Sequence, residues 1–264
     1  MDHLHNLNPA TMGRSMLIIN ALRGVVLGAM IFLIGDTSAL AEDVKGHKNH
    51  DMASEHGGQI FHKFHLESDY GTDGDDNIVS WDFDGWVGTD DNKLWLKSEG
   101  EHKDNTLETT EFWAMYSRNI ATFWDAQVGI RHDTEPTSTS YVVVGFSCLA
   151  PYWFEIEMHM FISDEGDMSA KLHVENEWLI TQKLILQPYG ELHVSAQDVP
   201  ERDIGAGFTD GKIGLQTRYE FTRKFAPYID VHYGRKLGQT SSISKDHGED
   251  RDEFVGAIGL RLMF

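Results

Sequence analysis

The amino-acid sequence predicts an all-β fold, an antiparallel transmembrane β-barrel of the bacterial outer-membrane type with twelve strands. From about Gln59 onward, apolar and polar residues alternate along segments of roughly nine to thirteen residues, a length typical of tilted strands that cross a bilayer. Turn-forming stretches such as 88–92 and 164–167 separate these segments. The final segment alternates up to an aromatic last residue, Phe264, as the closing strand of an exported barrel does.

Composition excludes several other classes of protein. The 264 residues carry 22 Lys and Arg against 42 Asp and Glu, a formal charge of −20, which argues against a nucleic-acid partner. A single cysteine, Cys148, excludes an internal disulfide framework and a cysteine-rich zinc site. We expect this thiol to be a small buried residue. No window of eighteen apolar residues follows the N-terminal region, so no helical membrane span is expected there.

The first 41 residues have the character of a cleaved signal peptide. Arg14 supplies positive charge, residues 24–34 form an uninterrupted apolar core, and residues 39–41 (Ala-Leu-Ala) fit the small-residue rule for signal peptidase. The alternative is a membrane anchor, which would place Arg23 in lipid at a cost of several kcal/mol. We therefore expect the protein to be exported and 1–41 to be removed.

Residues 42–58 form a polar, glycine-containing segment without apolar period, which predicts a flexible tail. Its candidate metal ligands are His47, His50, Met52 and His56. Imidazole suits copper(II), zinc and nickel, whereas a thioether favours copper(I). The spacing His47-x-x-His50-x-Met52 allows a short flexible chelate.

Residues 59–264 contain the predicted barrel. The expected strands are 59–70, 79–88, 92–102, 106–118, 120–132, 140–148, 152–163, 167–178, 183–197, 209–221, 226–237 and 253–264. An even number places both chain ends on the periplasmic side, and ten strands are an alternative because the first two segments alternate most weakly. Pro188 falls inside a predicted strand, where we expect a bulge because proline cannot donate to the ladder.

A soluble β-sandwich is the alternative fold, since its strands also alternate between a buried and a solvated face. Two observations favour the barrel. The segments are longer than typical sandwich strands, and the chain ends inside an alternating segment. A barrel places Met158 and Met160, which share an apolar face, against lipid.

The polar faces of three consecutive strands carry a candidate metal site. If the turn after 152–163 centres on Glu165, then His173 lies opposite Glu157, and the next hairpin places Glu191 opposite His173. His159 and His193 would lie nearby. A register slip of one residue would move the whole set to the lipid face.

The alternative interpretation of these side chains is structural. Barrels of this size fill their interior with charged residues, and several cations are available here to balance the carboxylates. These are Lys171, Arg118, Arg131, Arg218 and Arg261.

Several motifs resemble those of the copper resistance protein B family over roughly residues 91–264. The stretches are Tyr116-Ser117-Arg118, Phe123-Trp124-Asp125, Gln127-Val128-Gly129, Leu149-Ala150-Pro151-Tyr152-Trp153-Phe154-Glu155, Thr181-Gln182-Lys183-Leu184-Ile185-Leu186-Gln187-Pro188, Asp198-Val199-Pro200-Glu201-Arg202, Phe225-Ala226-Pro227-Tyr228 and Gly248-Glu249-Asp250. The resemblance implies an outer-membrane protein of a Gram-negative bacterium that binds copper, and a periplasmic multicopper oxidase as a partner. The long Met- and His-rich tract of many family members is reduced here to four residues of the tail, which weakens a high-capacity copper(I) store.

The resulting hypothesis is an outer-membrane barrel that binds copper, Cu(I) or Cu(II), as cargo and contributes to copper resistance by sequestration or export. Its partners are outer-membrane lipid, copper ions and the oxidase. The alternative is a general cation-preferring pore or a structural barrel. An outer-membrane hydrolase would need an activated serine, and Ser117, Ser163 and Ser195 lack a nucleophile motif, so we expect no enzymatic activity.

Overall fold

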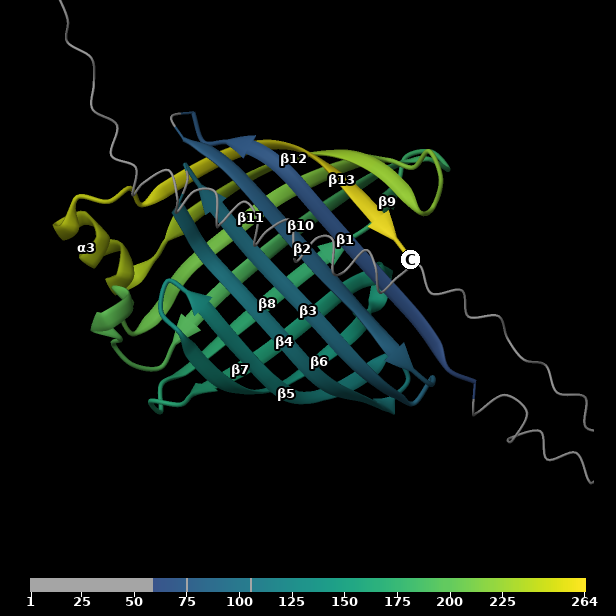
Figure 1. Ribbon diagram of the computed structural model, residues 1–264, viewed down its shortest axis with the longest axis horizontal. Coiled ribbons are helices and arrows are strands. Elements are labelled where there is room, and N and C mark those ends of the chain that lie inside the picture. Colours follow the sequence, from purple (N-terminus) through teal and green to yellow (C-terminus); the bar gives the residue numbers. More distant parts are fainter. Residues whose placement is uncertain (1–58, 75, 105) are drawn as a thin grey trace, which may run out of the picture. The chain divides into compact units, whose positions relative to one another are not determined.

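The computed structural model describes residues 59–264, apart from residues 75 and 105 (Figure 1). The predicted signal peptide 1–41 and the predicted tail 42–58 lie outside the described residues. Within the described part, no helix is long and apolar enough to cross a membrane.

Thirteen strands form one antiparallel sheet, and their bounds follow the predicted segments within a few residues. They are β1 (Phe61–Thr72), β2 (Asn77–Gly88), β3 (Asn92–Lys103), β4 (Thr106–Ala121), β5 (Trp124–Glu135), β6 (Thr139–Ala150), β7 (Phe154–Ser163), β8 (Met168–Asn176), β9 (Trp178–Leu179), β10 (Leu184–Ser195), β11 (Gly207–Tyr219), β12 (Phe225–Lys236) and β13 (Asp252–Met263). A short 3₁₀ turn, η1 (Pro151–Trp153), joins β6 to β7.

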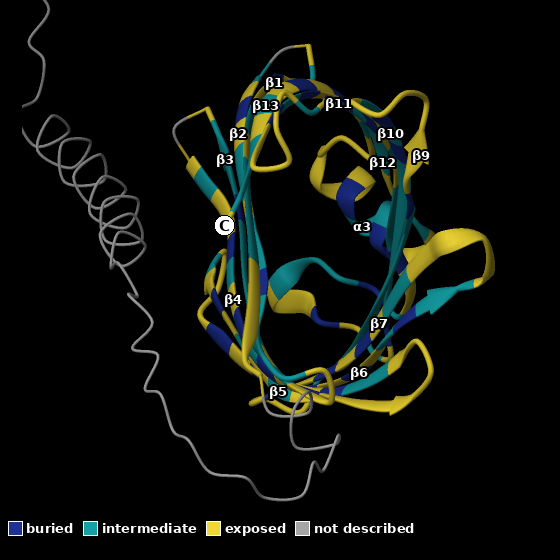
Figure 2. Cartoon of the chain, turned by 90° about the vertical axis from the view of Figure 1, so that its right-hand side faces the viewer, coloured by how far each residue is buried: buried dark blue, intermediate teal, exposed yellow. Residues whose placement is uncertain are grey.

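The sheet closes on itself as a twelve-strand barrel. Strands β1 to β8 pair in chain order, and so do β10 to β13, while β13 pairs with β1 (Figure 2). Both β8 and β9 pair with β10, and β9 continues the position of β8. The prediction of twelve strands is confirmed, and the two weakest segments are the strands β1 and β2. The ten-strand and sandwich alternatives are wrong because the ring is closed and includes both segments.

The two faces of the wall differ as the alternation predicts. On β6, the outward Val142 and Val144 are 53% and 43% exposed, whereas the inward Tyr141 and Val143 are 6% and 0% exposed. An outer surface of exposed aliphatic side chains requires lipid around it. Met158 and Met160 lie on the same outer surface.

Pro188 interrupts the ladder without forming a bulge. The pairs Tyr189–Glu175 and Leu186–Trp178 belong to one continuous register, so no residue is inserted on either strand. The ladder is broken opposite Pro188, where β8 ends and β9 begins, because the proline has no N–H to donate. The expected bulge is therefore wrong.

The two ends of the barrel have different connections. The start of β1, the end of β13 and the short turns of β2–β3, β4–β5 and β6–β7 lie at one end, which is the periplasmic end in barrels of this type. The opposite, extracellular end has two longer loops. One contains the 3₁₀ turn η2 (Pro200–Arg202), and the other contains the helix α3 (Gly238–His247).

The two long loops hold each other over the extracellular end. The Gly205 N–H donates to Thr240 Oγ1 over 3.0 Å. Arg202 donates to the hydroxyl of Tyr141 on β6, and its guanidinium lies 3.4 Å from Asp167 in the β7–β8 turn. Seen along the barrel, α3 projects inside the ring of strands (Figure 2). Together these contacts hold the β10–β11 loop across the extracellular end as far as β6. We call the β10–β11 and β12–β13 loops the extracellular cover.

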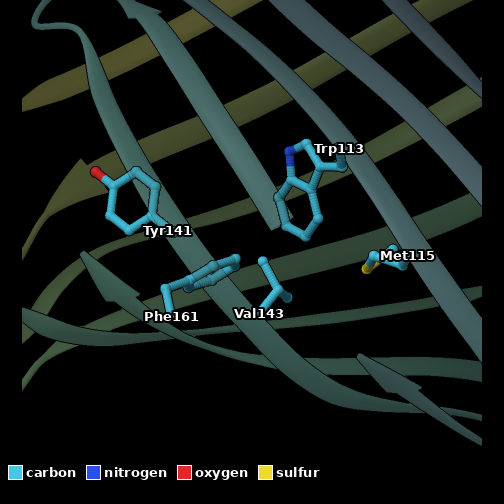
Figure 3. Close-up of a cluster of buried hydrophobic side chains, with 5 residues drawn as sticks. All are labelled: Trp113, Met115, Tyr141, Val143 and Phe161. Carbon is cyan, nitrogen blue, oxygen red and sulfur yellow. The ribbon is translucent and has the colours of Figure 1, made fainter. Parts of the chain in front are cut away.

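The main buried apolar cluster lies inside the barrel, on the side formed by β4, β6 and β7. It consists of Trp113, Met115, Tyr141, Val143 and Phe161 (Figure 3). A smaller apolar cluster of Ile78, Val255 and Ala257 lies elsewhere in the interior, whose remaining lining is mostly charged or polar. The lumen therefore has an aromatic side and an ionic side.

Candidate functional site

The predicted register of the candidate metal site is confirmed. Glu157 on β7 pairs with His173 on β8, and His173 pairs with Glu191 on β10. All three side chains line one interior cavity with a volume of about 430 Å³. The predicted turn around Glu165 sets this alignment, because a short β7–β8 connection leaves little freedom in the register.

His173 is held on both sides by carboxylates. Its Nδ1 lies 3.1 Å from Glu191 Oε1, and its Nε2 lies 3.2 Å from Glu175 Oε2. The ring stacks on Tyr189 with a centroid distance of 6.4 Å. Both ring nitrogens are therefore engaged.

Lysines reach across the lumen to the same carboxylates. Lys97 on β3 places its Nζ 2.5 Å from Glu157 Oε2 on β7. Lys171 on β8 lies 3.3 Å from Glu99 on β3 and 3.8 Å from Glu191 on β10. The Lys97–Glu157 and Lys171–Glu99 pairs join strands that are not neighbours in the sheet, so they connect opposite walls of the barrel.

The other two predicted lumen histidines do not join this arrangement. His159 is 2% exposed, lies 2.7 Å from Gln127 Oε1 through its Nε2, and meets Trp113 edge-on at 5.3 Å. It is a packed residue on the aromatic side. His193 lies on β10 with its Nδ1 3.3 Å from Asp210 Oδ1. The tail residues His47, His50, Met52 and His56 lie outside the described residues.

Among the residues that the structure describes, no group of three or more His, Cys, Asp or Glu is placed to hold a metal ion. The reason is visible at the predicted trio. Glu157 is engaged by Lys97, and the imidazole of His173 is clamped between two carboxylates. Metal binding at these residues stays a prediction.

Sequence reasoning missed two further histidine–carboxylate pairs that line the cavity. His65 Nδ1 lies 3.3 Å from Asp84, and His232 Nδ1 lies 2.7 Å from Asp230. The Nε2 of His65 is buried and has no hydrogen-bond partner. A carboxylate on one ring nitrogen orients the other nitrogen, as it does in metal sites. The alternation of the sequence could have identified them, because both histidines occupy inward positions of their strands.

A row of carboxylates crosses five neighbouring strands. Glu67, Asp82, Glu99, Glu111 and Asp133 lie directly opposite one another, in that order, from β1 to β5. Like charges in this position repel. Within the part of the chain that the structure describes, Asp82 forms no ion pair, whereas the others are within reach of a lysine or arginine.

Four of the five expected balancing cations face the lumen, and one does not. Arg218 is 3% exposed and donates to Glu177 and Gln187, and Arg261 donates to Glu67. Arg118 is an outward residue of β4, exposed on the outer wall. Its expected lumen role is wrong, because it shares the parity of the lipid-facing positions of its strand.

Arg131 is surrounded by the aromatic side of the lumen. Its guanidinium carbon lies 5.0–5.3 Å from the ring centres of Trp113, Tyr141 and Phe161. The same group contacts Glu111 at 2.8 Å and Asp133 at 2.6 Å. This cation therefore joins the apolar cluster of Figure 3 to the end of the acidic row.

The cavity as a whole is strongly anionic. Twelve carboxylates line it against five lysine and arginine side chains, a formal charge of −7 with neutral histidines. A low-dielectric wall around such an excess of one sign raises the local concentration of cations. The arrangement can attract and exchange cations without a rigid cage for one of them.

Comparison with known proteins identifies the chain's relatives. A family described as "Copper resistance protein B precursor (CopB)" matches residues 61–264. Copper resistance protein B of Escherichia coli is 36% identical over 230 residues, covering 87% of this chain and 76% of the relative. The homologue from Pseudomonas syringae pv. tomato is 34% identical over the same shares.

Among solved structures, the NanC porin matches with a TM-score of 0.54 at 12% identity, covering 75% of this chain and 98% of the porin. This likeness supports a porin-like β-barrel fold. Family, fold and extent of the match agree, and the chain belongs to the copper resistance protein B family.

Proposed function

We propose that this protein binds copper ions at the outer membrane of a Gram-negative bacterium and contributes to copper resistance by sequestration or export. The observation that carries the proposal is family membership over the whole barrel, residues 61–264. The proposal includes export by the cleaved signal 1–41, and a periplasmic multicopper oxidase as a partner. The protein acts by binding and passage, without covalent chemistry.

The lumen supports this proposal through its charge and its histidines. A formal charge of −7 favours entry of cations. The histidine–carboxylate pairs at His65, His173, His193 and His232 offer imidazole and oxygen ligands along the wall. Imidazole and carboxylate bind copper(II) more tightly than other divalent ions of the first transition series.

A general cation-preferring pore is the second candidate. It is favoured by one observation, the lack of a group placed to hold a metal among the described residues. The two candidates differ in whether the protein distinguishes copper from other cations.

Copper titration of the barrel in detergent separates them. We compare the chain from Glu42 with a chain that begins at Gln59, and measure bound copper by equilibrium dialysis against excess magnesium. Equal stoichiometry in both chains locates the metal in the barrel, and loss of all binding in the shorter chain locates it in the tail. Absence of copper retention in both chains would refute the proposal in favour of the general pore.

A pair of histidine variants sharpens the result. His173→Gln removes a lumen imidazole, whereas His132→Gln removes an outward, exposed imidazole of β5 and serves as the matched control. If the lumen holds copper, only His173→Gln lowers the bound amount. Equal behaviour of the two variants would exclude a site at His173.

A further inference from the structure

The lipid-facing wall over β4–β7 contains a hollow with a volume of about 490 Å³. Two register rows of outward side chains line it. One row is Tyr116, Val128, Val144 and Met160, and the neighbouring row is Arg118, Ala126, Phe146 and Met158. The lining is almost wholly apolar and contains no acidic residue.

The hollow arises from one small side chain. Ala126 on β5 lies directly between Arg118 on β4 and Phe146 on β6, and larger residues surround it in both rows. A methyl group in this place leaves a depression in a wall otherwise covered by long side chains. The depression lies over β5 between β4 and β6, and neighbouring strands are spaced about 5 Å apart, so its width accommodates an acyl chain.

Arg118 provides a cation at one end of this hollow. It is exposed, and its side chain forms no ion pair or hydrogen bond with any residue in the described range. It lies three residues before the end of β4, close to the β4–β5 turn at the periplasmic end. An arginine on the lipid-facing wall near a strand end reaches the headgroup level, where phosphates lie.

The adjacent β6–β7 turn presents two aromatic side chains at the same end. Tyr152 and Trp153 are 88% and 73% exposed, and both have positive φ of 66°. Non-glycine residues rarely adopt this conformation, and the Tyr152 carbonyl is held by the buried side chain of Asn176 over 2.8 Å. Tyr and Trp are enriched at the membrane–water interface. This turn therefore marks the headgroup region beside the hollow.

We propose that this hollow is a phospholipid site, in which an acyl chain lies over Ala126 and the headgroup phosphate pairs with Arg118. The guanidinium fork matches a phosphate diester and is always charged. The site faces the periplasmic leaflet, since Arg118 lies near the periplasmic end. It is independent of copper handling, because it lies on the outer surface of the barrel wall.

A second copy of the chain fits this face less well than a lipid. A protein partner would have to neutralise Arg118, because a cation removed from water without a partner is strongly unfavourable. The hollow itself has no carboxylate to offer in a two-fold contact. The phosphate of a lipid supplies the missing charge and the acyl chain fills the apolar space.

Native mass spectrometry of the barrel in detergent tests the proposal, with phosphatidylglycerol as the titrated probe. We expect one tightly bound lipid, and about tenfold weaker binding to Arg118→Gln, as for the loss of a charged hydrogen bond. Dipalmitoylglycerol, which has acyl chains but no phosphate, should bind both proteins equally and weakly. Inorganic phosphate alone should give no adduct, since it gains nothing from the apolar hollow.

Two further variants complete the test. Ala126→Leu fills the hollow and should lower the binding of phosphatidylglycerol. Arg223→Gln, an exposed arginine of the β11–β12 turn, removes the same charge elsewhere and should leave binding unchanged. Heat-modifiable gel migration verifies that each variant is folded. Wild-type affinity in Arg118→Gln, an equal loss in Arg223→Gln, or a dimer that Ala126→Leu dissociates would overturn the lipid site.

Discussion

Arg131 is the residue whose removal should most weaken the barrel. Its guanidinium is mostly buried, contacts Glu111 and Asp133 at 2.8 and 2.6 Å, and packs among three aromatic rings. Glu111 and Asp133 are also directly opposite each other in the ladder. Arg131→Met keeps much of the side-chain volume but leaves two facing carboxylates with no cation between them.

The expected loss in free energy of unfolding is about 3–5 kcal/mol. Removing one partner of a buried ion pair costs this much, because the remaining charge is desolvated and unpaired. Loss of the cation–π contacts adds about 0.5–1 kcal/mol. By contrast, Arg235 and Asp252 form an ion pair that is about half exposed, so Arg235→Met should cost less than about 1 kcal/mol.

Urea unfolding of the barrel in lipid vesicles, followed by tryptophan fluorescence, measures both variants. The triple variant Arg131→Met, Glu111→Gln, Asp133→Asn removes the two unpaired carboxylates and should regain at least half of the lost free energy. If Arg131→Met is as stable as Arg235→Met, the ion pairs do not support the barrel. If the triple variant regains nothing, the loss comes from packing against the rings and the electrostatic reasoning fails.

Three other expectations concern conduction, packing and the extracellular cover. Lys97→Met removes a tie to Glu157 across the lumen and one positive charge, so planar-bilayer recordings should show higher cation conductance and selectivity; unchanged currents would contradict this. A Cβ at Gly145 would lie 2.5 Å from both a backbone carbonyl and an imidazole, so Gly145→Val should lower the urea midpoint, whereas Gly256→Ala, with open space, should not. Arg202→Ala frees the β10–β11 loop and should speed its cleavage after Glu201 by a glutamate-specific protease, whereas equal rates would contradict a loop held in place by Arg202.

The strands were predictable because both faces of a membrane barrel are patterned. Lipid outside and charge inside give a period of two over the whole strand length, as on β7, where Met158 and Met160 face outward and Glu157 faces inward. The register at His173 was predictable for a different reason. The connection of β7 to β8 is short, so its length determines which residues face each other.

Contacts across the lumen were not predictable in the same way. Lys97 and Glu157 are sixty positions apart on strands that do not pair, and nothing local in the sequence relates them. His159 faces inward as its parity requires, yet Trp113 from β4 and Gln127 from β5 enclose it. The alternating position of a residue along its strand determines whether its side chain faces lipid or the lumen. Which side chain it then contacts depends on the curvature of the closed barrel.

Within the proposed function, the contacts of the lumen favour passage of copper over its storage there. Conduction requires binding that is strong enough to admit an ion and weak enough to release it. An anionic cavity in which His173 already has carboxylate partners meets the second condition, because an arriving ion must compete with existing contacts. Within the proposed function, tight retention would therefore fall to the tail ligands His47, His50, Met52 and His56, and copper bound by a chain that begins at Gln59 should exchange rapidly.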